Sequence, residues 1–149
     1  TVVEALGRHR LTPDLIELEI TESLLMDGGS EALGTLDELA RLGISLAVDD
    51  FGTGYSSLAY LKRLPIDRLK IDRSFVSSVH TDRSDAAVVR AIIAIAQELE
   101  LSVVAEGIES AEQAQALADL GCRYAQGYFF GRPMAPRALF DRVSSHCTR

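Results

Sequence analysis

Short apolar runs alternate with segments of helical periodicity along the chain. The apolar runs predict five strands, at residues 15–20, 44–48, 68–71, 101–105 and 123–126. Apolar residues that recur every three or four positions predict helices at residues 31–42, 56–64, 85–100, 111–120 and 136–145, and a further helix is expected around Glu4-Ala5-Leu6. Strands that alternate with helices indicate a parallel α/β fold with right-handed crossovers.

Residues typical of helix ends lie at the expected boundaries. Gly43 and Gly121 follow two predicted helices, Pro65 closes a third, Ser110 is a plausible N-cap, and Pro136 begins the last helix. No low-complexity linker divides the chain, so its 149 residues predict one domain.

Composition narrows the class of protein. With 47% hydrophobic and 25% charged residues, the chain is expected to be soluble and globular. A net charge of -7 without a basic stripe argues against binding to a nucleic-acid polymer. An anionic substrate remains compatible with this charge, since bound divalent cations would invert the local field.

The cysteines and the hydropathy pattern suggest a cytoplasmic location. Cys122 and Cys147 have no metal-site spacing and are read as free thiols. No apolar run reaches the roughly 18 residues of a membrane span, and no signal peptide is evident. Because the chain begins at Thr1 rather than Met, upstream residues are expected, and an inner-membrane anchor there is left open.

Charged or amide side chains lie at or just after the ends of all the predicted strands. They are Glu19, Glu22, Asp49, Asp50, Lys70, Asp72, Glu106, Glu109 and Gln126. Because the carboxyl ends of parallel strands form one rim, we expect these side chains to converge. Carboxylate and amide oxygens without histidine indicate Mg²⁺ or Mn²⁺. A carboxylate that bridges two ions would permit two-metal phosphoryl chemistry, assisted by the lysine and a glutamate.

Several of these residues have ordinary structural explanations. Glu22 could begin a loop, Lys70 could neutralise an aspartate, and Glu109 could belong to a helix start. Asp49 and Asp50 are harder to explain structurally, because adjacent carboxylates repel unless a cation or a proton compensates. The following Gly52-Thr53-Gly54 is a weak phosphate-loop signature, and we read it as a mobile loop at the edge of the site.

Five ordered segments of the chain form a recognisable set: Glu19–Ser23, Asp49–Leu58, Leu69–Asp72, Ala105–Glu109 and Gln126–Pro133. Together they resemble the EAL family of bacterial cyclic-di-GMP phosphodiesterases, which have a TIM-like barrel. The resemblance extends from about residue 15 to residue 136. It implies hydrolysis of cyclic-di-GMP to linear pGpG with two Mg²⁺ or Mn²⁺ ions.

The resemblance also implies a role for each motif residue. Glu19 and Asp49 would be metal ligands, with Asp49 bridging, and Asp50 would serve the second metal. Lys70 would hold the attacking water. Glu106 would be the base or a carboxylate ligand. Supporting or substrate-binding residues would be Asp72, Glu109 and Gln126. Glu22 would anchor the loop that contains Phe51, Gly52, Thr53, Gly54, Tyr55 and Ser56.

The chain is shorter than a complete barrel of about 250 residues. Residues 1–149 would form an incomplete EAL domain with strands four to eight, without the N-terminal part that carries a glutamate and an asparagine ligand. Glu4-Ala5-Leu6 spells the family motif but precedes the first strand in a helix, so we assign it no catalytic role.

Two expectations follow. The fragment alone should be inactive or nearly so. Its open sheet edges should be covered by an upstream part, an exchanged segment or another chain, as in a homodimer or an edge-pairing oligomer. Sensor or cyclase domains are expected in the parent chain.

Two other classes remain open. A catalytically inactive cyclic-di-GMP receptor or protein-interaction module would share the fold, although such relatives typically lose acidic ligands that are present here. A receiver domain also places an acidic pair and a lysine on a parallel sheet, but it does not fit the order of the five motifs.

Overall fold

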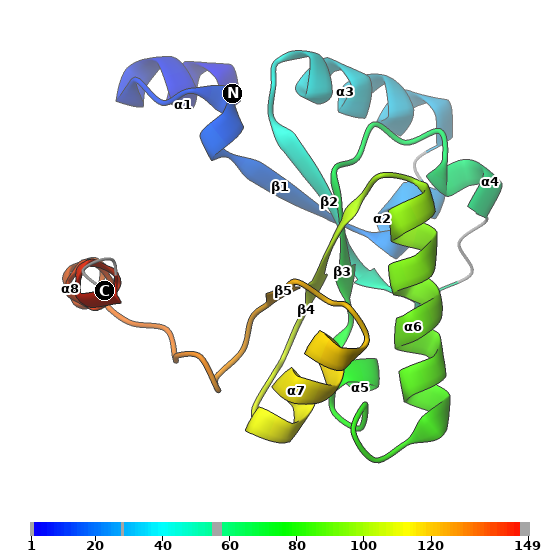
Figure 1. Cartoon of the computed structure of the whole chain (residues 1–149). Coiled ribbons are helices and arrows are strands. Elements are labelled where there is room, and N and C mark those ends of the chain that lie inside the picture. Colours follow the sequence, from blue (N-terminus) through cyan, green and yellow to red (C-terminus); the bar gives the residue numbers. More distant parts are fainter. Residues whose placement is uncertain (1, 28, 55–57, 147–149) are drawn as a thin grey trace.

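The computed structural model describes residues 2–27, 29–54 and 58–146. Its five strands form one parallel sheet in the sequential order β1-β2-β3-β4-β5 (Figure 1). The strands are β1 (Glu17–Thr21), β2 (Ser45–Phe51), β3 (Arg68–Ile71), β4 (Ser102–Ala105) and β5 (Tyr124–Ala125). All the predicted strands are present, and β3 has the predicted bounds.

Helices connect the strands and follow the last one. They are α1 (Val2–His9), α2 (Glu22–Asp27), α3 (Gly29–Arg41), α4 (Leu58–Leu61), α5 (Arg73–Val76), α6 (Arg83–Glu98), α7 (Ala111–Asp119) and α8 (Pro136–His146), with a 3₁₀ turn η1 (Pro13–Leu15) before β1. The short elements α2, α5 and η1 were not predicted. The segment predicted as a helix over residues 56–64 is helical only from 58 to 61 among the described residues.

Local chemistry explains the helix boundaries. Ser110 caps α7 as predicted, and its hydroxyl accepts from Gln113 N while the Gln113 side chain accepts from the Ser110 backbone N–H. Asp82 caps α6, the longest helix, by accepting from Ser84 N and Asp85 N. Gly43 and Gly121 adopt positive φ after α3 and α7, as expected for helix stops.

One face of the sheet is apolar and packs against helices. Leu46, Leu69 and Ile71 are fully buried in a core that includes Val89 of α6 and Leu117 of α7. Burial of each such side chain contributes roughly 1.5–3 kcal/mol relative to exposure. This face therefore supplies much of the stability that holds the strands in register.

The opposite face is polar. Alternate residues along the strands carry charge there, with Glu17 and Glu19 on β1, and Arg68 and Lys70 on β3. Figure 1 shows α8 (red) set apart from the sheet, beyond the extended segment that follows β5. No helix among the described residues is long and apolar enough to cross a membrane.

The acidic pair corrects the predicted end of the second strand. β2 continues through Asp49 and Asp50 to Phe51, although we expected the strand to end at Val48. Its pairing with β3 is irregular between Val48 and Phe51, and Asp50 has a φ of +54°. A bulge of this kind lets the strand continue past the two carboxylates.

The strand order also decides between fold classes. Receiver-type domains have the order 2-1-3-4-5, whereas this sheet runs sequentially from β1 to β5. Consecutive parallel β/α units are the arrangement of a TIM-like barrel, here with β1 and β5 as the outer strands of the described sheet. The receiver alternative is therefore wrong.

Candidate active site

A buried lysine lies at the centre of the polar face. Lys70 is only 4% exposed, and its ammonium lies 2.6 Å from Glu19 Oε1, 3.1 Å from Asp49 Oδ1 and 2.7 Å from Glu106 Oε1. Gln126 Nε2 donates to Glu106 Oε1 at 2.7 Å. We call these five residues the Lys70 cluster. Each comes from a different strand or the position directly after it.

The register of the sheet explains the convergence. Glu19 pairs with Ala47, which lies two residues before Asp49, and Lys70 pairs with Val104, which lies two residues before Glu106. Glu106 and Gln126 follow on the same face, because side chains two residues apart point the same way. Residues that are distant in sequence are thus brought to one place by pairing alone.

Charge in the Lys70 cluster is unbalanced. Three carboxylates surround one ammonium, which leaves two negative charges when all are ionised. Burial opposes the charged form of Lys70, but hydrogen bonds to Glu106, Glu19 and Asp49 outweigh it and raise its pKa. Burial raises the pKa of Glu106, and Lys70 opposes this shift. A raised pKa makes Glu106 a better proton acceptor than an ordinary ionised glutamate.

The donor set fits a hard divalent cation. Its oxygens come from carboxylates and an amide, the ligands that Mg²⁺ and Mn²⁺ prefer, and its excess negative charge favours the binding of a cation. Across residues 2–27, 29–54 and 58–146, no three His, Cys, Asp or Glu side chains are arranged to hold a metal ion directly. The carboxylates are arranged around the Lys70 ammonium instead.

Asp50 and Asp72 form a second acidic group beside the cluster. Partial burial, Asp49 and Asp72 together raise the pKa of Asp50, against a smaller opposing effect of Lys70. Desolvation would raise the pKa of Asp72, but hydrogen bonds from Ser74 outweigh it and lower the pKa. Asp72 caps α5, accepting from Ser74 N at 3.0 Å and Ser74 Oγ at 2.5 Å, so it also has a structural role.

Glu22 holds the loop that follows β2. It is 2% exposed at the start of α2, and its Oε2 accepts from Gly52 N at 3.0 Å and from Gly54 N at 3.3 Å. Thr53 Oγ1 donates to Asp50 O at 2.8 Å, and Phe51 is buried. The predicted loop residues Tyr55 and Ser56 lie outside the described residues.

Glu109 lies apart from the Lys70 cluster. Its Oε1 is 2.6 Å from Arg73 Nη2, and both side chains are about half exposed or more, at 48% and 63%. Arg73 was not singled out from the sequence, since its partner is 36 residues away. The ion pair joins the start of α5 to the loop that follows β4.

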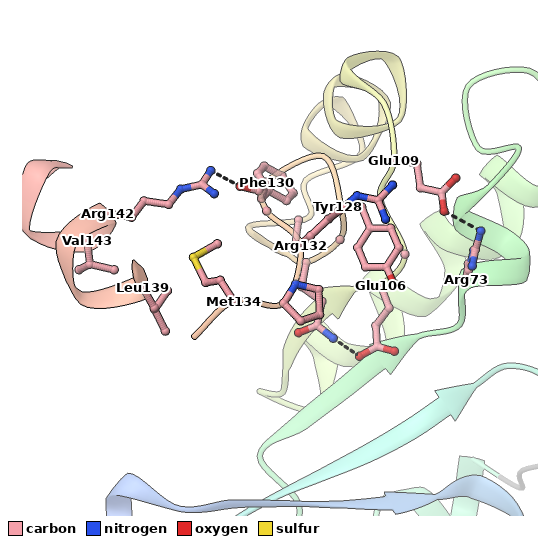
Figure 2. A pocket seen from close by; sticks show the side chains of 16 residues that line it. Arg73, Glu106, Glu109, Tyr128, Phe130, Arg132, Met134, Leu139, Arg142 and Val143 are labelled. Carbon is pink, nitrogen blue, oxygen red and sulfur yellow. Dashed lines mark hydrogen bonds and ion pairs between the residues drawn. The ribbon is translucent and has the colours of Figure 1, made fainter. Parts of the chain in front are cut away.

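A cavity of about 1080 Å³ extends from Glu106 and Gln126 towards α8 (Figure 2). It is lined by apolar and aromatic side chains and by arginines, including Tyr128, Phe130, Met134, Leu139, Val143, Arg73, Arg132 and Arg142. Arg132 Cζ lies 4.6 Å from the centre of the Tyr128 ring. The cavity is large enough for a nucleotide-sized ligand.

Sequence reasoning did not assign the cavity residues Tyr128 and Arg132 a role, although they lie in the segment after the last strand. The signal that could have identified them is an aromatic residue and an arginine in a short segment bounded by Gly127 and Pro133. Gly127 is required structurally, because a Cβ there would lie 2.1 Å from Ile108 O and 2.2 Å from Ile108 N. This close approach brings the segment onto the end of β4.

Comparisons with known proteins agree with this architecture. The family profile described as "EAL domain" matches residues 1–133. MucR of Pseudomonas aeruginosa, a bifunctional diguanylate cyclase/cyclic di-GMP phosphodiesterase, is 46% identical over 144 residues, which are 97% of this chain and 21% of MucR. NbdA of the same species, a cyclic di-GMP phosphodiesterase, is 48% identical over 145 residues, which are 97% of this chain and 18% of NbdA.

Solved structures show the same arrangement of elements. The MucR phosphodiesterase in complex with c-di-GMP superposes with a TM-score of 0.88 at 48% identity, over 93% of this chain and 56% of that chain. The manganese/cy-diGMP complex of BlrP1 from Klebsiella pneumoniae superposes with a TM-score of 0.84 at 34% identity, over 89% of this chain and 34% of that chain. The chain spans about a fifth of the curated relatives MucR and NbdA, at 21% and 18%. With nearly its whole length matched, this chain belongs to the EAL domain family.

Proposed function

We propose that this chain contributes the Lys70 cluster to a phosphodiesterase that hydrolyses cyclic-di-GMP to linear pGpG. The observation that carries the proposal is the Lys70 ammonium, held within 2.6–3.1 Å of carboxylates from β1, β2 and the residue after β4. Support comes from MucR and NbdA, which are described as cyclic di-GMP phosphodiesterases and share nearly half of their matched residues with it.

Two Mg²⁺ or Mn²⁺ ions are the proposed cofactors. Glu19, Asp49, Asp50 and Glu106 would hold them, with Asp49 between the two. The manganese in the BlrP1 complex supports this choice of metal. Bound there, the ions would supply positive charge that stabilises the phosphoryl transition state and activates water.

The side chains of this chain would complete the reaction. Lys70 donates to carboxylates from a fixed position, and once bound ions drew one of those carboxylates away, the N–H released would orient the attacking water. Glu106, whose pKa is raised by burial, would accept the proton of that water as its oxygen bonds to phosphorus and the bond to the 3′ oxygen breaks, and the released 3′ oxygen would take a proton from solvent. Gln126 holds Glu106 in place. Asp72 and Glu109 would support the substrate side of the site.

The remaining features of the assembly are also proposals. Residues 1–149 would correspond to strands four to eight of the barrel and, alone, would turn over little or no substrate. A homodimer or edge-pairing oligomer, sensor or cyclase domains in the parent chain, and a cytoplasmic location of the site belong to the same proposal. MucR, which is bifunctional and much longer than this chain, supports further domains.

A hybrid protein tests the activity. Residues 1–149 would replace the aligned part of the MucR phosphodiesterase domain, to which they are 48% identical. We expect the hybrid to convert cyclic-di-GMP to pGpG in the presence of Mn²⁺, measured by chromatography, while residues 1–149 alone convert little or none. Asp49→Asn in the hybrid should abolish turnover.

The hybrid also separates the proposed enzyme from the alternative. Binding of cyclic-di-GMP without turnover would favour a catalytically inactive receptor or regulatory module. Neither binding nor turnover in a folded hybrid would contradict both. The control is the exposed Asp37→Asn on α3, which should leave turnover unchanged.

A further inference from the structure

A second set of cross-strand contacts lies beneath the Lys70 cluster, centred on Arg68. Arg68 Nη1 lies 3.0 Å from Glu17 Oε1 and 2.9 Å from Glu17 Oε2, and Arg68 Nε lies 3.0 Å from Ser102 Oγ. The guanidinium carbon is 5.8 Å from the centre of the Tyr124 ring. We call Glu17, Arg68, Ser102 and Tyr124 the Arg68 brace. From β3 it reaches β1, β4 and β5.

The brace repeats the geometry of the cluster one step lower in the sheet. Glu17 and Glu19 lie two residues apart on β1, as Arg68 and Lys70 do on β3, so both pairs point to the same face. Glu17 pairs with Arg68 as Glu19 pairs with Lys70. Both ion pairs cross β2 diagonally, because each glutamate on β1 lies one step lower in the sheet than the cation that it contacts on β3.

Two matched ion pairs specify one register. A slip of β1 by two residues in either direction leaves one of the two glutamates and one of the two strand-β3 cations without its matched partner. β2 allows the crossing because Arg68 is paired there with Ala47, whose small side chain is fully buried.

The guanidinium is suited to this task. It donates to Glu17 and Ser102 through different nitrogens of one rigid fork, and Ser102 Oγ in turn donates to Asp67 O at 3.1 Å. A lysine at this position would keep the charge but would not span both partners. Among the described residues, neither Arg68 nor Glu17 makes an ion pair or hydrogen bond to a carboxylate of the Lys70 cluster.

We propose that Arg68, through Glu17, is a positioning residue that keeps Glu19 aligned with Lys70 and thereby sets the geometry of the divalent-cation site. The inference rests on the proposed function, since it takes the Lys70 cluster as the place where the ions bind. It assigns a role to two residues that need not touch metal or substrate. Residues that orient metal ligands typically change metal affinity by about 10–100-fold when replaced.

The first readout needs no metal. The ammonium of Lys70 has all three of its hydrogen-bond partners in place, which should slow proton exchange enough to give a resolved ¹⁵N–¹H signal in residues 1–149. We expect Arg68→Gln and Glu17→Gln to broaden or remove this signal, and Arg90→Gln on the exposed side of α6 to leave it unchanged.

The second readout is the affinity for Mn²⁺ alone, measured by calorimetry at a temperature where each variant is folded. We expect Arg68→Gln and Glu17→Gln each to weaken binding about tenfold or more, and the double variant to be no weaker than either one. If Arg68→Gln does not fold, Arg68→Lys is measured instead and should show the same two changes.

The outcomes separate the two proposals. A lower melting temperature with an unchanged Lys70 signal and unchanged Mn²⁺ affinity would show that Arg68 has only a structural role, and would overturn the inference. If the wild-type chain does not bind Mn²⁺, the proposed metal site fails, and the Lys70 signal alone still decides whether Arg68 positions the cluster.

Discussion

The two faces of the sheet use the same strands for different purposes. On the helix-covered face, Leu69 and Ile71 are completely buried among apolar side chains. On the other face, Arg68 and Lys70 alternate with them along the same four-residue strand and make ion pairs to β1. One face is stabilised by removal from water, and the other by mutual pairing of charges that would otherwise be costly to bury.

The comparison shows how a site can be built on a stable element without being part of its core. The apolar face fixes the position of the backbone, and the backbone then holds the charges at separations near 3 Å, such as the 3.1 Å from Lys70 to Asp49. The polar face keeps a residual negative charge, since three carboxylates surround one ammonium. That charge is what makes the face suitable for cations.

The largest effect is expected on the apolar face. Leu69→Ala should lower the free energy of unfolding by about 3 kcal/mol, because it leaves a cavity at a fully buried position. Chemical denaturation measures the loss. Leu15→Ala, at a position that is 66% exposed, is the matched control and should cost less than about 0.5 kcal/mol. Equal losses would contradict the assignment of the core.

The second-largest effect on the free energy of unfolding is expected at Lys70, the buried ammonium at the centre of the polar face. Lys70→Met should lower the free energy of unfolding by about 2 kcal/mol in metal-free buffer, because the carboxylates around it lose their shared donor. Lys62→Met, at an exposed position after α4, should change it by less than about 0.5 kcal/mol. A Lys70→Met variant more stable than the wild type would mean that desolvation of the ammonium outweighs its ion pairs.

A smaller effect is expected where the polar face meets the loop after β2. Glu22→Gln keeps the size of the side chain but removes the charge that accepts from Gly52 N and Gly54 N. It should cost about 1 kcal/mol and speed hydrogen exchange at those two amides. Glu98→Gln, exposed at the end of α6, should do neither. Unchanged exchange in Glu22→Gln would show that the carboxylate does not anchor the loop.

The smallest effect is expected at the edge of the site. Glu109→Gln breaks an ion pair with Arg73 whose side chains are 48% and 63% exposed, so it should cost less than about 0.5 kcal/mol in chemical denaturation. A loss as large as that of Lys70→Met would mean that exposure does not separate the two ion pairs, and the contrast between the sheet centre and its edge would fail.

The sequence predicted what local patterns encode. β3 was placed at residues 68–71, and α7 starts at 111 after its Ser110 cap, because apolar runs and capping residues are local features. The short helices α2 and α5 were missed, since six and four residues are too few to show helical periodicity. β2 was ended too early, because charged residues are unusual inside a strand and a bulge leaves no clear pattern.

The sequence also predicted which side chains converge at the centre of the site, but not the ion pairs around it. Convergence of Glu19, Asp49, Lys70 and Glu106 follows from strand ends on one rim, and the structure places them together. Glu109 was expected in the same group but pairs with Arg73 instead. Arg68 was not singled out, because its partner Glu17 is 51 residues away and only the register brings them together. The catalytic and metal-binding roles stay predictions.

Calorimetric titration of residues 1–149 with Mn²⁺ tests most directly whether the Lys70 cluster is a divalent-cation site. The wild-type chain should bind Mn²⁺, Asp49→Asn should lose this binding while remaining folded, and Asp37→Asn on α3 should bind as the wild type does. Mn²⁺ binding that is identical in the wild type and in Asp49→Asn, or absent from the folded wild-type chain, would contradict the account.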